Sequence, residues 1–264
     1  MYKIIFKNKI NLLFLLISFL CLINVVGIDN VSFKSTEWLY IGESSQHQLG
    51  WHFFKNDIWR FPLGSNPNYG DEFSNSIVFA DAIPILALFF KSLKSFIPGS
   101  FQYFSFWYFI CFFLQLFFSF KIIKKFTGSD LYSVIGSFFF LISPIFIYRV
   151  DEHLALASQW LLLFALYLGL TQKIDKAKLL WILLIILSSL INLYFTAMVV
   201  AVYSLLRIFN LKFEKETFFK FIKDFFIIAI LLLLTMYIVG FFEIRMIDSL
   251  GTGFGYYKLN LLSI

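Results

Sequence analysis

The chain has 264 residues, of which 60% are hydrophobic and 14% are charged. Soluble globular proteins carry about 25% charged residues, and the mean hydropathy of this chain is +0.81. This composition excludes an ordinary soluble enzyme and predicts an all-α integral membrane protein. The net charge of +6 does not indicate a nucleic-acid partner, because the basic residues cluster between apolar runs, where they set membrane orientation.

The first apolar run extends from residue 10 to about residue 27 and follows Lys3, Lys7 and Lys9. A helix of about 18 residues can cross a hydrocarbon core of about 30 Å. The preceding lysines indicate a cytoplasmic N-terminus. A cleaved signal peptide is the alternative, but the run is longer than the apolar region of such a peptide and no small-residue cleavage site follows it.

A polar segment follows the first span. Over residues 28–82 it contains tryptophans, prolines, glycines, acids and histidines. Such a segment cannot lie exposed in lipid, because its backbone polar groups would have no partners there. Its aromatic residues favour an ordered structure over a disordered linker. We therefore expect a large extracytoplasmic loop, which covers residues 28–100 when the next segment is included.

Residues 83–97 are apolar, but they are too few to span comfortably and contain Lys91 and Lys94. If this segment crossed the membrane, the later basic clusters would lie outside, against the positive-inside rule. If it lies along the membrane surface, all of them lie inside. We therefore expect an interfacial helix, with its lysines toward headgroups. The side chains expected to face lipid are Ile85, Leu88, Phe89 and Phe96.

Further apolar runs follow the interfacial helix. Residues 179–209 are too long for one span and carry Asn192 and Tyr194 near the middle, so we expect two helices joined by a tight turn. The fold class is therefore an all-α membrane domain over residues 1–264 with about seven transmembrane helices. The glycine-rich tail, residues 243–264, is expected to begin an extracytoplasmic segment of a truncated protein. The later spans expected are 101–123, 131–148, 154–170, 179–193, 194–209 and 225–242.

The polar loop contains the first candidate site residues. Glu43 lies shortly after the first span, and His47 follows one helical turn later, so a helix would place both on one face. A carboxylate in such a position can take the proton of an acceptor hydroxyl. A solvated loop acid or a local helix cap is the alternative interpretation of Glu43.

Three more acids follow in the same loop. Asp71 and Glu72 come directly after a turn signal and form the weak candidate pair for a divalent metal or an acceptor, although adjacent acids in a turn are usually solvated. Asp81 precedes Pro84 at a position typical of a helix N-cap. Its alternative role is to direct a carboxylate into a cavity between the interfacial helix and the spans.

A short charged segment separates two later spans. Arg149 and His153 flank two acids there, and the guanidinium fork of an arginine matches the oxygens of a lipid phosphate. Interfacial anchoring and local pairing of Arg149 with the adjacent acids is the alternative.

Several motifs resemble those of a known membrane family. The sequence contains Gly-acid-x-x-x-His-x-x-Gly-Trp at 42–51, Phe-Pro-Leu-Gly at 61–64, Asn-Pro-x-Tyr-Gly at 66–70 and Asp-Ala-Ile-Pro at 81–84. With these motifs the whole chain resembles an uncharacterised bacterial membrane family of GT-C-like architecture. The acid in the first loop and the following juxtamembrane helix also resemble GT-C glycosyltransferases such as the protein mannosyltransferases. Those enzymes commonly carry Asp where this chain has Glu43.

The resemblance implies a bacterial inner-membrane glycosyltransferase that moves a sugar from a polyprenyl-phosphate donor to a glycan or lipid acceptor outside the cytoplasm. A divalent metal is the candidate cofactor. A transporter or flippase, and a noncatalytic assembly subunit, are the alternative functions. Motifs for nucleotide hydrolysis, dinucleotide binding and serine or zinc hydrolysis are absent from the sequence. The implied catalytic residues are Glu43 and Asp81, and the implied substrate-binding residues are His47, Trp51, Asp71, Arg149 and His153.

Overall fold

The computed structural model describes residues 2–69, 75–209 and 215–243, with side chains except those of residues 2–8, 151–152 and 215–217. Within these ranges the regular structure is helical, apart from one isolated bridge between Ser65 and Ser76. The prediction of an all-α fold is therefore confirmed for the described part of the chain.

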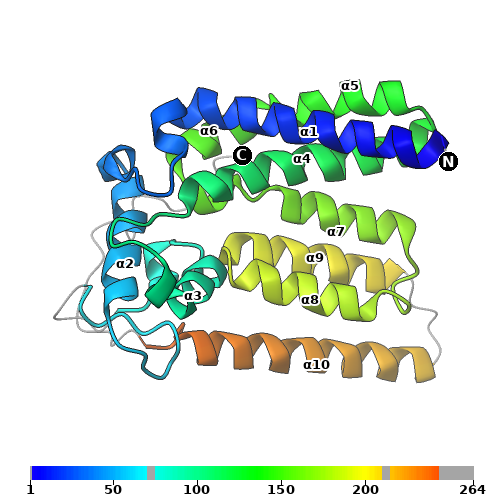
Figure 1. The fold of residues 1–264 in the computed structure, drawn as a ribbon. Helices are drawn as coiled ribbons and strands as arrows, with labels where there is room; N and C mark the ends of the chain where they lie inside the picture. Colours follow the sequence, from blue (N-terminus) through cyan, green and yellow to red (C-terminus); the bar gives the residue numbers. More distant parts are fainter. Residues whose placement is uncertain (1, 70–74, 210–214, 244–264) are drawn as a thin grey trace, which may run out of the picture.

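The long helices lie roughly side by side and form an elongated bundle (Figure 1). Two shorter helices, α2 (Ser44–Asn56) and α3 (Pro84–Ser92), lie together at one end of it. The N-terminus lies at the opposite end. The bundle helices are α1 (Tyr2–Val26), α4 (Phe104–Thr127), α5 (Asp130–Leu141), α6 (Pro144–Glu152), α7 (Trp160–Thr171), α8 (Lys178–Ser189), α9 (Leu193–Phe209) and α10 (Lys215–Val239).

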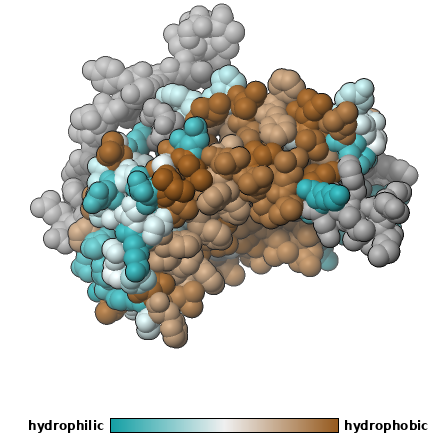
Figure 2. All heavy atoms as spheres, turned by 45° about the horizontal axis from the view of Figure 1, so that its top comes forward, coloured by the Kyte–Doolittle hydropathy of each residue, from teal (hydrophilic) through white to brown (hydrophobic). Residues whose placement is uncertain are grey.

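Apolar side chains cover the middle of the bundle on the face shown in Figure 2, and hydrophilic side chains gather toward its two ends. In the described residues, 4 helices are long and apolar enough to cross a membrane, namely Lys9–Val26, Phe104–Thr127, Leu154–Thr171 and Phe218–Val239. A fifth candidate is the pair α5 and α6, which is bent by 52°. Helices α8 and α9 are apolar but shorter, so the expected number of spans is not confirmed.

The expected division of residues 179–209 is confirmed. Helix α8 ends at Ser189 and α9 begins at Leu193, and the two lie against each other as a hairpin (Figure 1). At the turn, the side-chain oxygen of Asn192 accepts a hydrogen bond of 2.9 Å from the Tyr194 amide. This bond satisfies one of the free N–H groups at the start of α9.

Helix α3 corresponds to the expected interfacial helix, but the prediction for Lys91 is wrong. Its side chain is buried, with Nζ 3.8 Å from the ring centroid of Phe54 and 4.8 Å from that of Trp59. The amine also donates to the Ile58 carbonyl at 3.3 Å. Two aromatic faces and a carbonyl replace water around the ammonium, which therefore joins α3 to α2 instead of facing headgroups. Phe89 and Phe96 are exposed, as expected, whereas Ile85 and Leu88 are partly buried against the core.

The basic clusters lie at the end of the bundle that holds the N-terminus. Lys124 and Lys125 are in the last turn of α4, and Arg207 is in the last turn of α9. Lys178 begins α8 at the same end. Helices α2 and α3 lie at the other end, so the bundle separates its basic clusters from its polar loop.

Candidate functional site

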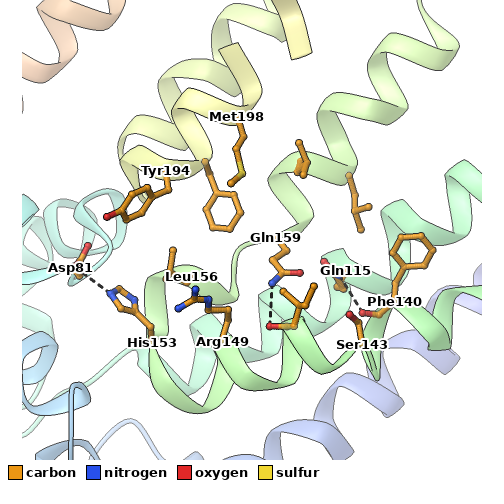
Figure 3. Close-up of a pocket in the computed structure, with 14 residues that line it drawn as sticks. Asp81, Gln115, Phe140, Ser143, Arg149, His153, Leu156, Gln159, Tyr194 and Met198 are labelled. Atoms are coloured by element: carbon orange, nitrogen blue, oxygen red, sulfur yellow. Dashed lines mark hydrogen bonds and ion pairs between the residues drawn. The ribbon is translucent and has the colours of Figure 1, made fainter. Parts of the chain in front are cut away.

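A cavity of about 830 Å³ opens where the polar loop meets the bundle, between α6, α7 and α9 (Figure 3). The residues that line it include Asp81, Arg149, His153 and Tyr194. Most of the remaining wall is apolar, so the cavity suits a ligand with a charged head and an apolar tail. The apolar lining comprises Phe140, Ile145, Leu156, Leu162, Leu163, Phe195 and Met198.

The bend between α5 and α6 shapes this cavity. Pro144 occupies the first turn of α6, where its missing N–H costs nothing, so a new helix starts there in a new direction. Gln115 donates to the Phe140 carbonyl at 3.3 Å and Gln159 to the Ile145 carbonyl at 3.5 Å. These amides satisfy carbonyls beside the break. The opposite face of α6 borders an apolar groove of about 610 Å³ next to α1.

Helix α4 fixes the C-terminal end of α6. The Trp107 indole donates to the Leu154 carbonyl at 2.8 Å, and the Tyr108 hydroxyl donates to the Val150 carbonyl at 2.5 Å. Arg149 therefore projects into the cavity, one turn before His153 (Figure 3). Its guanidinium stacks over Tyr148 at 5.6 Å and forms no ion pair with any carboxylate whose side chain is described. Among the described side chains, no carboxylate competes with an anion for its fork.

Asp81 points at the same cavity, and its expected role as an N-cap is wrong. The N-cap residue of α3 is Ile83, without a side-chain cap. Asp81 and Ile83 both have left-handed backbones, with φ of 48° and 52°. This conformation costs about 1–3 kcal/mol at each such residue. It turns Asp81 away from α3, so that Oδ2 lies 3.4 Å from His153 Nε2 and Oδ1 accepts from the Asn192 amide at 3.5 Å.

Neighbouring contacts hold this strained turn in place. The Tyr103 hydroxyl donates to the Ala82 carbonyl, and the Ile85 amide donates to the Leu190 carbonyl at 2.9 Å. Ile83 itself is fully buried. Strain that is maintained by surrounding packing is common at functional sites.

His47 lies directly behind His153. It is buried on α2, Nδ1 donates to the Ala80 carbonyl at 2.8 Å, and its ring meets that of His153 edge to face at 5.1 Å between centroids. Burial lowers the pKa of His47, and the nearby His153 adds to this effect. The carboxylates of Asp81 and Glu43 act in the opposite direction.

The other predicted site residues are not brought to the cavity. Glu43 is exposed beside the first turn of α2, close enough to influence His47, but it does not line the cavity. Trp51 is fully buried and its indole donates to the Phe101 carbonyl at 2.9 Å, which is a packing role. Asp71 and Glu72 lie outside the described residues. No group of three or more His, Cys, Asp or Glu in the described residues is suited to a metal ion.

Sequence reasoning assigned no site role to Asn192 or Tyr194. Both line a second cavity of about 360 Å³, which shares Asp81 and Tyr194 with the large one. A polar residue inside an apolar run was the available signal, because such residues are often functional in membrane proteins.

A family described as a domain of unknown function, DUF6311, matches residues 15–264. The chain belongs to the DUF6311 family. This agrees with the expected membership of an uncharacterised family. No curated protein and no solved structure matches the chain.

Proposed function

We propose that this DUF6311 protein is a membrane glycosyltransferase that moves a sugar from a polyprenyl-phosphate donor to a glycan or lipid acceptor. The observation that supports this best is the lining of the large cavity, in which the Asp81 carboxylate and the Arg149 guanidinium accompany an extended apolar wall. Glycosyl transfer needs a base near the acceptor hydroxyl and a cation near the leaving phosphate.

The donor would bind with its phosphate at Arg149 and His153. A guanidinium binds phosphate through paired, charge-assisted hydrogen bonds, and Arg149 has no competing carboxylate among the described side chains. The polyprenyl chain would lie along the apolar wall around Leu162 and Met198. The sugar would then lie toward Asp81.

The acceptor would enter by the second cavity. It meets the large cavity at Asp81 and Tyr194, and its wall includes Phe79 and Phe241 together with the Asn192 amide. Aromatic rings and an amide are suited to a sugar or a similar polyol. Asp81 would take the proton of the attacking hydroxyl as the sugar–phosphate bond breaks. We therefore assign the base to Asp81 instead of Glu43, which does not line either cavity.

The orientation follows from charge. The basic clusters share one end of the bundle with the N-terminus, and the positive-inside rule assigns that end to the cytoplasm. The loop with α2 and α3 would then face the outside of a bacterial inner membrane, where polyprenyl-linked sugars would reach Asp81.

A turnover assay tests the assignment. The purified protein in lipid nanodiscs would be incubated with radiolabelled polyprenyl-phosphate sugar and an envelope extract. We expect Asp81→Asn to lower kcat by about 100-fold or more, and Arg149→Ala mainly to raise KM for the donor, because it removes ground-state phosphate binding. Asp29→Asn, an exposed acid in the same loop, is the control.

Absence of labelled product from the wild-type protein with every such donor would overturn the proposed function. Full activity of Asp81→Asn would overturn only the assignment of the base.

A transporter or flippase is the second candidate, because the 52° break between α5 and α6 is the kind of discontinuity found in transporters. Reconstituted vesicles separate the two functions. Movement of labelled polyprenyl-phosphate sugar across the bilayer without formation of a glycosidic bond would favour the transporter.

A further inference from the structure

The chain contains 3 histidines, and two of them meet beside the large cavity. His47 comes from α2, and His153 follows the last turn of α6. His153 lies against Asp81 at the edge of the cavity (Figure 3), and His47 lies behind it, against Ala80. His52, the third histidine, is exposed on α2. The fold thus connects Asp81 to α2 through two imidazoles.

Each of the two rings has one nitrogen with a neighbour and one without. His47 Nδ1 donates to the Ala80 carbonyl, and His153 Nε2 faces Asp81. His47 Nε2 and His153 Nδ1 are buried, and neither has a hydrogen-bond partner within the described residues. A buried polar atom without a partner costs about 1–3 kcal/mol. Two such atoms on adjacent rings therefore indicate a function.

One proton can form a hydrogen bond between these two buried nitrogens. An N–H at His153 Nδ1 can donate to the lone pair of His47 Nε2 after a rotation of the rings, because their centroids are only 5.1 Å apart. The carboxylates of Asp81 and Glu43 are close enough to His47 to favour a positive charge on its ring, whereas repulsion between the two imidazoles disfavours a second charge.

We propose that His153 and His47 form a proton relay that carries the proton from Asp81 to the buried ring of His47. The relay rests on the glycosyl transfer proposed above. As the acceptor O–H bond breaks, Asp81 takes the proton, and the electron pair of the breaking sugar–phosphate bond stays on the phosphate. Asp81 passes a proton to His153 Nε2, and His153 passes the one on Nδ1 to His47 Nε2. The proton stays on His47 until the products leave, and it then returns to Asp81 by the same path.

The relay has a physical purpose. Asp81 borders both cavities, so a bound donor and acceptor would fill the space through which water reaches its carboxylate. His47, on α2, lines neither cavity. It can therefore hold the proton from the base while both cavities remain filled.

The first test compares His47→Asn with His52→Asn. An asparagine amide at position 47 can still donate to the Ala80 carbonyl, but it lacks the second ring nitrogen. At low buffer concentration we expect His47→Asn to lower turnover by about tenfold. We expect added imidazole to restore most of the lost turnover. His52→Asn should match the wild type. Equal turnover of His47→Asn and His52→Asn, or a loss that imidazole does not restore, would overturn the relay while leaving the transferase intact.

The second test needs no turnover. With only 3 histidines in the chain, NMR of histidine-labelled protein can follow each ring, assigned through the single variants. We expect Glu43→Gln to lower the pKa of His47 and His153→Asn to raise it, because these changes remove an attractive and a repulsive charge. The relay would be overturned if neither substitution changed the pKa of His47. A wild type without transferase activity would overturn both proposals.

Discussion

The charged residues that line the large cavity differ in their pairing from those at the end of the bundle that holds the N-terminus. At the end that holds the N-terminus, Arg207 bonds to Asp175 at 2.7 Å and also to Asp224, which in turn pairs with Lys178. At the other end, Arg149 pairs with no carboxylate among the described side chains, and Asp81 reaches only the His153 ring and the Asn192 amide.

This difference separates a structural charge network from a candidate binding site. A paired buried network connects the elements that carry its members, here α8, α9 and the start of α10. Breaking such a pair leaves a buried charge without compensation and is strongly destabilising. Arg149 is exposed and Asp81 is partly exposed. A charge that remains accessible to solvent contributes little to stability, so its removal mainly removes an interaction with a ligand.

The largest effect on stability is expected at the paired end. Asp224→Asn removes a carboxylate that binds both Arg207 and Lys178, and both Asp224 and Arg207 are buried. We expect the free energy of unfolding to fall by about 3 kcal/mol and the melting temperature in detergent to fall with it.

The matched change at the other end is Asp81→Asn. Asparagine tolerates the left-handed backbone of this position, so we expect the melting temperature to change little while turnover is lost. The comparison fails if Asp81→Asn destabilises the protein as much as Asp224→Asn.

A smaller effect is expected at Lys91, whose ammonium has aromatic neighbours in place of an ion pair. Burial lowers the pKa of Lys91 from 10.5 to about 8. Between these two values the unfolded chain binds more protons than the native one, so the free energy of unfolding due to this group rises with pH. We expect Lys91→Met to remove that rise across the window, measured by urea unfolding in detergent. Lys94→Met should retain it.

The last prediction concerns membrane orientation and not stability. It tests which compartment each end of the bundle faces. Single cysteines would replace the exposed Ser95 and Lys125 in a chain whose native Cys21 and Cys111 are changed to alanine. An impermeant thiol reagent should label position 95 from outside intact cells and position 125 only after lysis. The reverse pattern would place the proposed site in the cytoplasm, where it would need a different donor.

The sequence predicted those features that depend on local order. The apolar runs located the helices, and Asn192 located the turn between α8 and α9. Pro144 lies within the expected span 131–148, but it begins a new helix, because its ring cannot continue the preceding one. The expected number of spans is not confirmed by the described helices.

The features of the site that the sequence missed depend on contacts between distant segments. Asp81 matched an N-cap by position, but the contacts of Tyr103 and Leu190 beside it support a left-handed turn that points it elsewhere. Lys91 finds its aromatic neighbours on another helix. The meeting of His47 with His153 requires the complete fold, so no local pattern indicates it.

The bend at Pro144 also has a mechanical consequence. Helix α6 has the large cavity on one face and the apolar groove on the other, so few side chains resist its sideways motion. Its C-terminal end is fixed by the hydrogen bonds of Trp107 and Tyr108, whereas its N-terminal end can pivot at the break. Small rotations about this hinge would move Ile145, at the start of α6, along the cavity wall, while Arg149 beside the fixed end keeps its position. The same helix can thus fit its apolar wall to lipid tails of different width without moving the cation.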